Sequence, residues 1–344
     1  MDFGRQGTAV RAPRRLPIIS NRHTGGFPLK DFEYVAPRTL REAISLLAEK
    51  GERARVLAGG TDLLVQLRSR RFELDRVVDI KHIPELDELS FGPRRGLRIG
   101  AAVSCSRLYN DPEIVERYPG LIDSASIIGG VQIQGRATFG GNLCNASPSG
   151  DAISSLIVHA AVAEIAGPDG KRTVPVAEFC TGPGQSVLQP GEILVALQIP
   201  PPRKFSGGHY LRFIPRNEMD IAVVGAGAYV ELADRKRAFK TVRIALAAVA
   251  PTPLVAGEAA ELLIGHQVDD EAIAAAAEAA RAAARPISDM RGPADFRRHL
   301  VGVLTARALK GAVARARGQF VPNAVQDPEN ADAPIPVRRP EAAG

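Results

Sequence analysis

The sequence has few of the residue types that build metal centres and disulfide frameworks. Of 344 residues none is tryptophan, three are cysteine and six are histidine. Cys105, Cys144 and Cys180 are far apart and form no C-x-x-C pair, so the chain cannot supply four ligands for an iron–sulfur cluster or a structural zinc ion. A sparse, odd number of cysteines is typical of free thiols in a reducing compartment. We therefore expect a cytoplasmic protein that has no metal site of its own.

The sequence also has no apolar run near the roughly 18 residues that would span a bilayer, so no membrane segment is expected. Its formal charge of +6 is concentrated at one end: residues 1–30 hold six Lys or Arg and one acid, which gives +5 and leaves +1 for the rest. This basic N-terminal extension has only a four-residue apolar segment at 16–19, which is too short for an export signal. A nucleic-acid-binding fold is excluded, because the remaining chain has no general basic character.

Two glycine-pair segments stand out in what remains. Gly59-Gly60-Thr61-Asp62 follows a predicted strand at 55–58 and precedes a predicted helix at 63–68. Thr138-Phe139-Gly140-Gly141-Asn142 is followed by Asp151, directly before a predicted helix at 152–161. Glycine permits φ > 0 and close backbone approach, and N–H groups at a helix start favour a phosphate. Each segment alone is also compatible with an ordinary turn, and Asp151 or Ser149 with an ordinary helix cap.

The remaining pattern predicts an α+β chain of two domains. Pro200-Pro201-Pro202 separates a domain at 31–202, split near 85–90, from a second at 203–318, and a Pro-rich tail follows at 319–344. In the first domain we predict helices at 39–51, 106–110 and 113–126, and strands at 77–80, 97–101, 162–165, 173–176 and 193–199. Three strands at 208–215, 222–232 and 241–249, followed by helices at 256–264, 269–284 and 293–317, predict a three-stranded antiparallel sheet with a helical bundle.

In this setting the two segments resemble the FAD-binding medium subunits of molybdenum hydroxylases, the family of the carbon monoxide dehydrogenase flavin subunit and the xanthine dehydrogenase flavin domain. The resemblance runs from about residue 32 to about residue 317. Downstream markers support it: Tyr210-Leu211-Arg212-Phe213, Met219-Asp220-Ile221-Ala222-Val223, and the run from Asp289 through Phe296-Arg297-Arg298 to Leu309. It implies a two-part FAD-binding domain of the vanillyl-alcohol-oxidase/PCMH-like type, followed by the family's C-terminal flavoprotein domain.

The resemblance also implies which residues bind FAD. The first loop would hold the diphosphate on backbone N–H groups, the second would hold its other side, and Asp151 would accept hydrogen bonds from cofactor hydroxyls. Ile128 and Leu194 fall where the family contacts the flavin, and Arg212 stands where the family usually has lysine. The implied contacts are Val56, Leu57, Ala58, Gly59, Gly60, Thr61, Asp62, Leu63, Ile128, Thr138, Phe139, Gly140, Gly141, Asn142, Asp151, Leu194 and Arg212.

The implied function is electron transfer, with no catalytic residue on this chain. Electrons would come from 2Fe–2S clusters on a small partner subunit, while a large partner subunit carries the molybdenum cofactor, in an expected dimer of heterotrimers. They would leave through FAD to NAD, a quinone or oxygen. Two alternatives stay open. A self-sufficient flavin oxidoreductase would use His82, His159 or His209 as an acid or flavin anchor, and a scaffold subunit would have vestigial loops.

Overall fold

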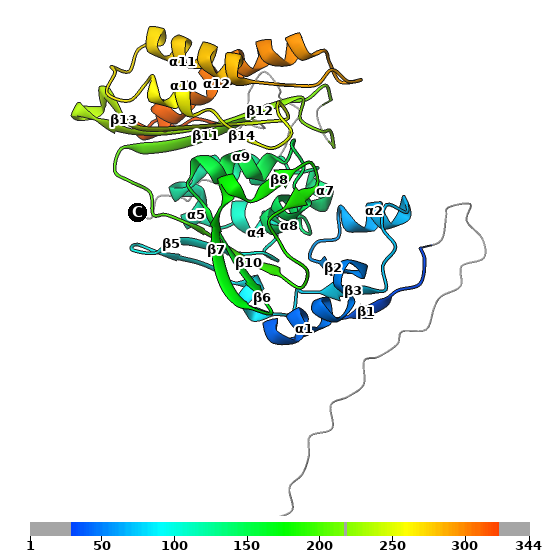
Figure 1. Ribbon diagram of the computed structural model, residues 1–344. Helices are drawn as coiled ribbons and strands as arrows, with labels where there is room; N and C mark the ends of the chain where they lie inside the picture. Colours follow the sequence, from blue (N-terminus) through cyan, green and yellow to red (C-terminus); the bar gives the residue numbers. More distant parts are fainter. Residues whose placement is uncertain (1–28, 217–218, 323–344) are drawn as a thin grey trace, which may run out of the picture.

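The computed structural model describes residues 29–216 and 219–322. The predicted extension at 1–30 and tail at 319–344 lie outside these residues except for their inner ends. Figure 1 shows a layered arrangement, with helices α10 to α12 above a sheet, further helices and a second sheet beneath it, and a small third sheet at the edge. The mixed helix and strand fold predicted from the sequence is confirmed.

The small sheet at the N-terminal edge is parallel, in the order β1 (Glu33–Val35), β3 (Arg76–Asp79), β2 (Ala54–Leu57). Helix α1 (Leu40–Lys50) begins at Thr39, whose hydroxyl accepts a hydrogen bond from the Glu42 N–H at 3.2 Å. This is the N-cap that the Thr-x-x-Glu spacing predicts. Helix α1 packs through a buried apolar stripe, the short α2 (Leu63–Arg68) packs near β2 and β3, and α3 (Pro84–Asp87) packs on the five-stranded sheet that follows in the chain.

A five-stranded antiparallel sheet forms the second part of the N-terminal half. Its order is β4 (Leu89–Gly92), β5 (Gly96–Gly100), β10 (Ile193–Ile199), β6 (Val162–Gly167), β7 (Gly170–Pro175). Strand β10 is buried on both faces: Leu194 and Leu197 join the main core, while Ile193 and Val195 join the core beneath α1. This central strand therefore ties the two parts of the N-terminal half together.

The helix predicted at 106–110 has its expected length, whereas those predicted at 113–126 and 152–161 are broken or shorter. The helices on this sheet are α4 (Cys105–Tyr109), α5 (Pro112–Arg117), α6 (Pro119–Ala125), α7 (Val131–Gln134), α8 (Phe139–Asn145) and α9 (Asp151–Val158). The single helix predicted at 113–126 is wrong, because the chain breaks at Tyr118, with φ −131° and ψ 51°. A proline disfavours helical geometry in the residue before it, and Pro119 follows directly.

The C-terminal sheet is antiparallel and consists of β11 (Ser206–Phe213), β12 (Val224–Ala233), β13 (Ala238–Ala247) and β14 (Leu254–Val255). The prediction of three strands is therefore corrected to four. The two-residue β14, paired with Ala245 and Leu246, is too short to show the alternation that reveals a strand.

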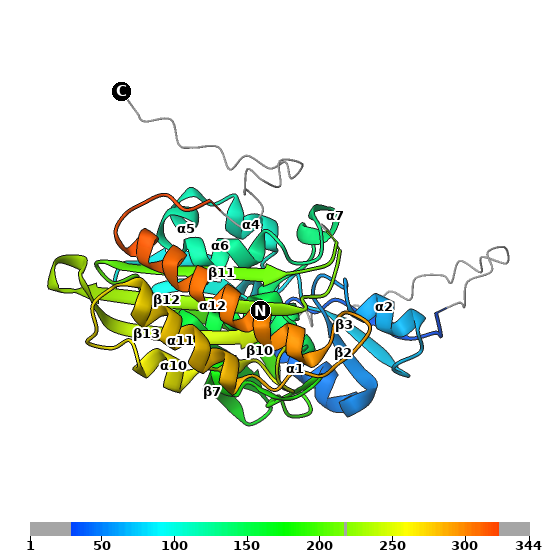
Figure 2. The ribbon, with the colours of Figure 1, turned by 90° about the horizontal axis from the view of Figure 1, so that it is seen from above.

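Helices cover both faces of this sheet. On one face lie α10 (Gly257–Glu261), α11 (Asp270–Ala283) and α12 (Ala294–Ala316), and Figure 2 shows α11 and α12 crossing the strands. On the other face α9 packs against β12 and β13. None of the helices in the described part combines the length and apolar character needed to cross a bilayer.

Candidate functional site

A cavity of about 650 Å³ lies between the two parts of the N-terminal half. One wall is the loop after β2 with the start of α2, and the other is the start of α8 with β10. A small hairpin, β8 (Cys180–Gly182) and β9 (Gln185–Ser186), contributes a further side. Cofactor sites typically have volumes of about 300–1,000 Å³, so this cavity has the size of a ligand site.

The first glycine pair forms a turn that needs both glycines. Gly60 has φ +76°, which a residue with a Cβ adopts only with strain. Gly59 packs directly on the carbonyl group of Arg136, and any Cβ at Gly59 would overlap that oxygen. The first loop therefore rests on the residues that lead into the second, and the two predicted segments meet in space.

Side chains strengthen this meeting of the loops. Gln66 of α2 donates a hydrogen bond to the Asn145 side-chain oxygen at 3.0 Å, and the Asn145 amide donates to Asp62 at 3.4 Å. Asn142 accepts a hydrogen bond from the Ala152 N–H at 3.2 Å, which ties the end of the second segment to the first turn of α9. The cavity wall is therefore one connected structure.

The second glycine pair is part of a helix, which corrects the prediction of a loop. Thr138 is the N-cap of α8 and its hydroxyl accepts a hydrogen bond from the Gly141 N–H at 2.7 Å. Neither Gly140 nor Gly141 has positive φ. Gly140 is required by packing, because a Cβ there would lie 2.5 Å from the Ala101 carbonyl oxygen. The wall thus presents a helix N-terminus, where free N–H groups and the helix dipole favour an anion.

Charge on the cavity wall is mixed. Arg55 and Arg71 both lie over the Phe72 ring, at 5.0 and 5.5 Å from its centroid, and both line the cavity. Burial raises the pKa of Asp62 above its usual value. Glu192 is neutralised by Arg172 through a pair at 2.7 Å. Glu52 also lines the cavity, so the positive and negative side chains nearly balance, and the preference for an anion comes from the α8 N-terminus.

Most of the predicted site residues come together in this cavity. Thirteen of them line it: Val56, Ala58, Gly59, Gly60, Thr61, Asp62, Leu63, Ile128, Thr138, Gly140, Gly141, Asn142 and Leu194. Leu57 and Phe139 instead point into apolar clusters behind the wall. These two positions are held by packing, so any contact that they make with a ligand would be through the backbone.

Asp151 and Arg212 lie away from the cavity lining. Asp151 is buried and accepts hydrogen bonds from the Tyr210 hydroxyl at 3.0 Å and from the Arg212 guanidinium at 2.6 Å. Burial raises the pKa of Asp151, while the Arg212 charge opposes that rise. In this structure the pair joins α9 to β11.

Sequence reasoning missed the third side of the cavity. Thr181, Gly184, Gln185 and Ser186 come from the β8–β9 hairpin, and a loop at 188–192 closes the same side. Pro190 and Gly191 have the composition of a turn, but nothing in the local sequence indicates that this turn faces a cavity. Arg55, Arg71 and Phe72 were missed for the same reason, since only the fold brings them to the wall.

The three histidines of the alternative function do not line this cavity. His82 is exposed at the surface, whereas His159 and His209 are 6% and 5% exposed. Burial lowers the pKa of each buried histidine to about 4, so both are neutral near pH 7. The geometry gives none of the three a position to act on a ligand in the cavity.

Comparison with known proteins agrees with this geometry. Residues 30–202 match the family model of the FAD binding domain in molybdopterin dehydrogenase, and residues 209–312 match that of the carbon monoxide dehydrogenase flavoprotein C-terminal domain. The chain belongs to the FAD-binding subunits of the molybdenum hydroxylase family, and it is an FAD-containing oxidoreductase subunit. The expected family and cofactor are thereby confirmed.

Individual relatives are similar over most of the chain. It is 35% identical over 288 residues to a putative xanthine dehydrogenase FAD-binding subunit of Escherichia coli, covering 83% of this chain and 98% of the relative. It is 34% identical over 291 residues to the carbon monoxide dehydrogenase medium chain of Hydrogenophaga pseudoflava, with the same coverage. A solved carbon monoxide dehydrogenase from that organism superposes with a TM-score of 0.80 at 33% identity, covering 84% and 99% of the two chains.

Proposed function

We propose that this chain seats FAD in the 650 Å³ cavity and transfers electrons between partner subunits and a final acceptor. The observation that carries the proposal is the convergence of the Gly59-Gly60 turn and the α8 N-terminus on one cavity. Backbone N–H groups from two directions would hold the diphosphate, without side-chain charge in direct contact.

The residues present fit a dinucleotide. The close packing of Gly59 on Arg136 brings the backbone of the first loop against the residues that lead into the second, so both segments line one cavity. The α8 N-terminus complements negative charge, and Arg55 and Arg71 add positive charge at one end. Leu194 and Ile128 supply apolar wall for a planar ring system.

Asp151 and Arg212 enter the proposal in a modified role. The Asn142 side chain, which lines the cavity, holds the Ala152 N–H in the first turn of α9, and Asp151 begins that helix. The Asp151–Arg212 pair then fixes α9 against β11. We propose that the pair positions this edge of the cavity. A contact of Asp151 with a cofactor hydroxyl would require its carboxylate to bind both that hydroxyl and Arg212.

The electron route and assembly are also part of the proposal. When bound, FAD supplies the conversion between one-electron and two-electron transfer. We propose a small 2Fe–2S subunit as donor, a large molybdenum subunit as the substrate site, and NAD, a quinone or oxygen as acceptor. The relatives described as FAD-binding subunit and medium chain support this, as do the separate matches at 30–202 and 209–312, which support domains at 31–202 and 203–318.

A glycine substitution tests the cofactor site. Gly141 lines the cavity, and only the Thr138 hydroxyl, at 3.0 Å, lies within 4 Å of a Cβ added there. Gly141→Val would place two methyl groups where the ligand approaches the α8 N-terminus. We expect purified Gly141→Val to fold but to retain little FAD, measured as the flavin-to-protein absorbance ratio. Gly257→Val, at the open first turn of α10, is the matched control and is expected to keep its flavin.

Full flavin occupancy in Gly141→Val would contradict the assigned cavity. The assembly is tested by co-purification with the products of neighbouring genes. We expect a cysteine-rich small subunit and a large molybdenum subunit to co-purify, and the isolated chain to show no substrate turnover. Turnover of a hydroxylation substrate by the isolated chain would instead favour a self-sufficient oxidoreductase.

A further inference from the structure

A second cavity, of about 350 Å³, lies at the seam between the N-terminal half and the C-terminal sheet. Its walls come from both sides: the turn at Tyr118-Pro119, the end of α9 at His159, the Pro200-Pro201-Pro202 linker, and strands β11 to β13. No residue is shared with the lining of the first cavity. The two cavities are therefore separate sites.

Arg243 of β13 is the central charged group of this second cavity. Its Nε donates a hydrogen bond to the Val158 carbonyl oxygen, and its guanidinium lies 4.3 Å from the centroid of the Tyr229 ring. Among the described residues, no carboxylate lies within 4 Å of this guanidinium. Burial lowers the pKa of this half-buried arginine, and Tyr229 and the more distant Glu231 oppose that shift only in part.

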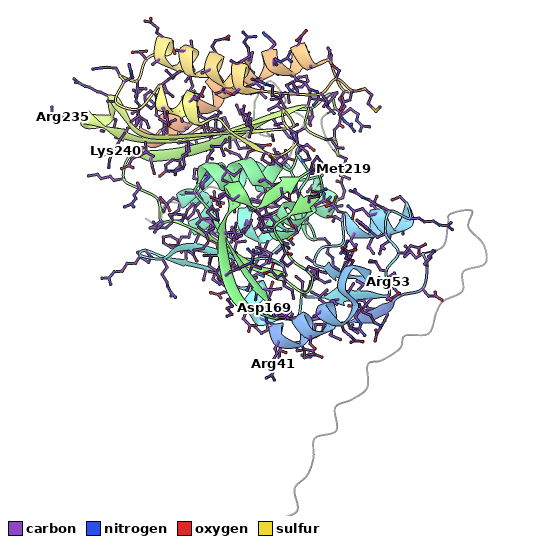
Figure 3. All side chains as sticks on the ribbon, in the orientation of Figure 1. Arg41, Arg53, Asp169, Met219, Arg235 and Lys240 are labelled. Carbon is purple, nitrogen blue, oxygen red and sulfur yellow. The ribbon has the colours of Figure 1, made fainter. Side chains whose placement is uncertain are left out.

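The other charges at this cavity are already paired or lie at its rim. Arg315 makes a bidentate pair with Asp123 at 2.6 and 2.8 Å. Glu231 is paired with Lys240 at 2.7 Å, near the far end of the β12–β13 hairpin, where Figure 3 labels Lys240. Arg203 is exposed in the linker and has no ion-pair partner within the described residues, although its charge helps to lower the pKa of Glu231. The unpaired charge toward the cavity is thus mainly positive, apart from Glu116 at its edge.

The rest of the wall is aromatic and apolar. His159 lies between Tyr118 and Tyr229, with ring centroids 6.5 and 5.7 Å away. The His159 Nδ1 is 2.8 Å from the Ser155 carbonyl oxygen, so it donates there, and the neutral ring is inclined to Tyr118 by 53° and to Tyr229 by 67°. A planar body could contact one of these inclined rings with its face and another with its edge, while its anionic group faces Arg243.

We propose that this seam cavity binds a small organic carboxylate with an aromatic or other flat apolar body, held by the Arg243 guanidinium. The planar guanidinium matches a carboxylate through paired N–H donors. Because the walls come from both halves, the bound anion would also hold the N-terminal half and the C-terminal sheet together.

Benzoate is the probe for this site. Binding of sodium benzoate to the FAD-loaded full chain is measured by calorimetry at constant ionic strength, with sodium chloride as the reference and inorganic phosphate as a ringless anion. We expect saturable benzoate binding, at least about tenfold tighter than phosphate, because phosphate lacks the apolar contact. Arg243→Gln should weaken benzoate binding about tenfold or more, since a charge-assisted bidentate contact is lost.

Two further variants keep the test decisive. Arg203→Glu changes only the exposed rim and should weaken benzoate several-fold even if Arg243→Gln fails to fold. Arg281→Gln, on the exposed face of α11 and paired with Glu278, makes the same charge change away from the seam and should leave binding unchanged. Binding no tighter than chloride, or equal binding by wild type, Arg203→Glu and Arg243→Gln, would overturn the proposal. Flavin content should stay constant throughout.

Discussion

The first cavity and the seam between the N-terminal half and the C-terminal sheet differ in how completely their polar groups are paired. The cavity wall consists of exposed backbone, helix N–H groups and a few charged side chains of both signs around an open volume. The seam, outside its small anion cavity, is closed by buried ion pairs, Asp123 with Arg315 and Asp151 with Arg212. A cavity whose polar groups lack protein partners can bind a ligand. A seam whose charged groups are already paired holds the two domains in place. Substitutions in the first cavity should therefore lower FAD retention, and substitutions at the seam should lower the free energy of unfolding.

The largest effect is expected at the seam. Asp123 is fully buried, and besides its pair with Arg315 it accepts a hydrogen bond from the Tyr210 N–H at 3.0 Å. Asp123→Asn leaves Arg315 buried without a counter-charge, which should cost about 3–5 kcal/mol. Urea unfolding measures this loss, and the folded fraction should keep its FAD. Asp75→Asn breaks the exposed pair with Arg53 at 2.6 Å and should leave the midpoint almost unchanged. If Asp123→Asn and Asp75→Asn lowered the urea midpoint equally, the buried pair would not be what stabilises the seam.

At the cavity wall, Gly59→Ala should affect both properties. The added Cβ meets the backbone of Arg136, which cannot rotate away, so the cost should reach about 3 kcal/mol, the upper range for overpacking. Separation of the loops should also release FAD. Gly135→Ala, where nothing lies within 4 Å of the added Cβ, is the control for both the unfolding midpoint and the flavin ratio. A Gly59→Ala protein with wild-type flavin content would show that the contact between the loops is dispensable.

Acid should weaken the seam before the cavity. The pKa of His159 is lowered from 6.5 to about 4, so the unfolded state binds more protons between these values. The stability present above pH 6.5 is therefore lost as the pH falls toward 4, by about 2 kcal/mol at pH 5. In His159→Gln, the free energy of unfolding measured with urea should therefore fall by about 2 kcal/mol less on acidification to pH 5 than it does in the wild type. His82→Gln, at an exposed position, should keep the wild-type dependence, and an unchanged slope in His159→Gln would refute the assignment.

The smallest effect is expected at two helix N-caps, Thr138 and Thr39, of which only Thr138 lies at the cavity. Thr138→Val removes the N-cap of α8, and Thr39→Val removes the equivalent cap of α1. Each should cost about 1 kcal/mol of stability in denaturant. Only Thr138→Val should also lower flavin retention, because only α8 begins at the cavity. If both variants kept their flavin equally well, the α8 N-terminus would have no role in holding the cofactor.

Sequence patterns predicted the local elements of this fold well. The Thr39–Glu42 spacing predicted the start of α1, and the predicted strand at 193–199 agrees with β10. Such features depend on dihedral preferences and hydrogen bonds between near neighbours, which a short stretch of sequence contains. Strand β14 and the break at Tyr118 were missed, because the first is defined by its partner and the second by the geometry before Pro119.

The sequence by itself determined that two glycine segments, each before a helix, were available to bind an anion, and its resemblance to a family indicated FAD. Only the tertiary structure decided that Gly60 needs a positive φ while Gly140 needs space beside Ala101. It also decided that Asp151 faces Arg212, and that the β8–β9 hairpin closes the cavity. The reason is physical: both glycine pairs have the same local freedom, and contacts between distant residues select the conformation that each adopts.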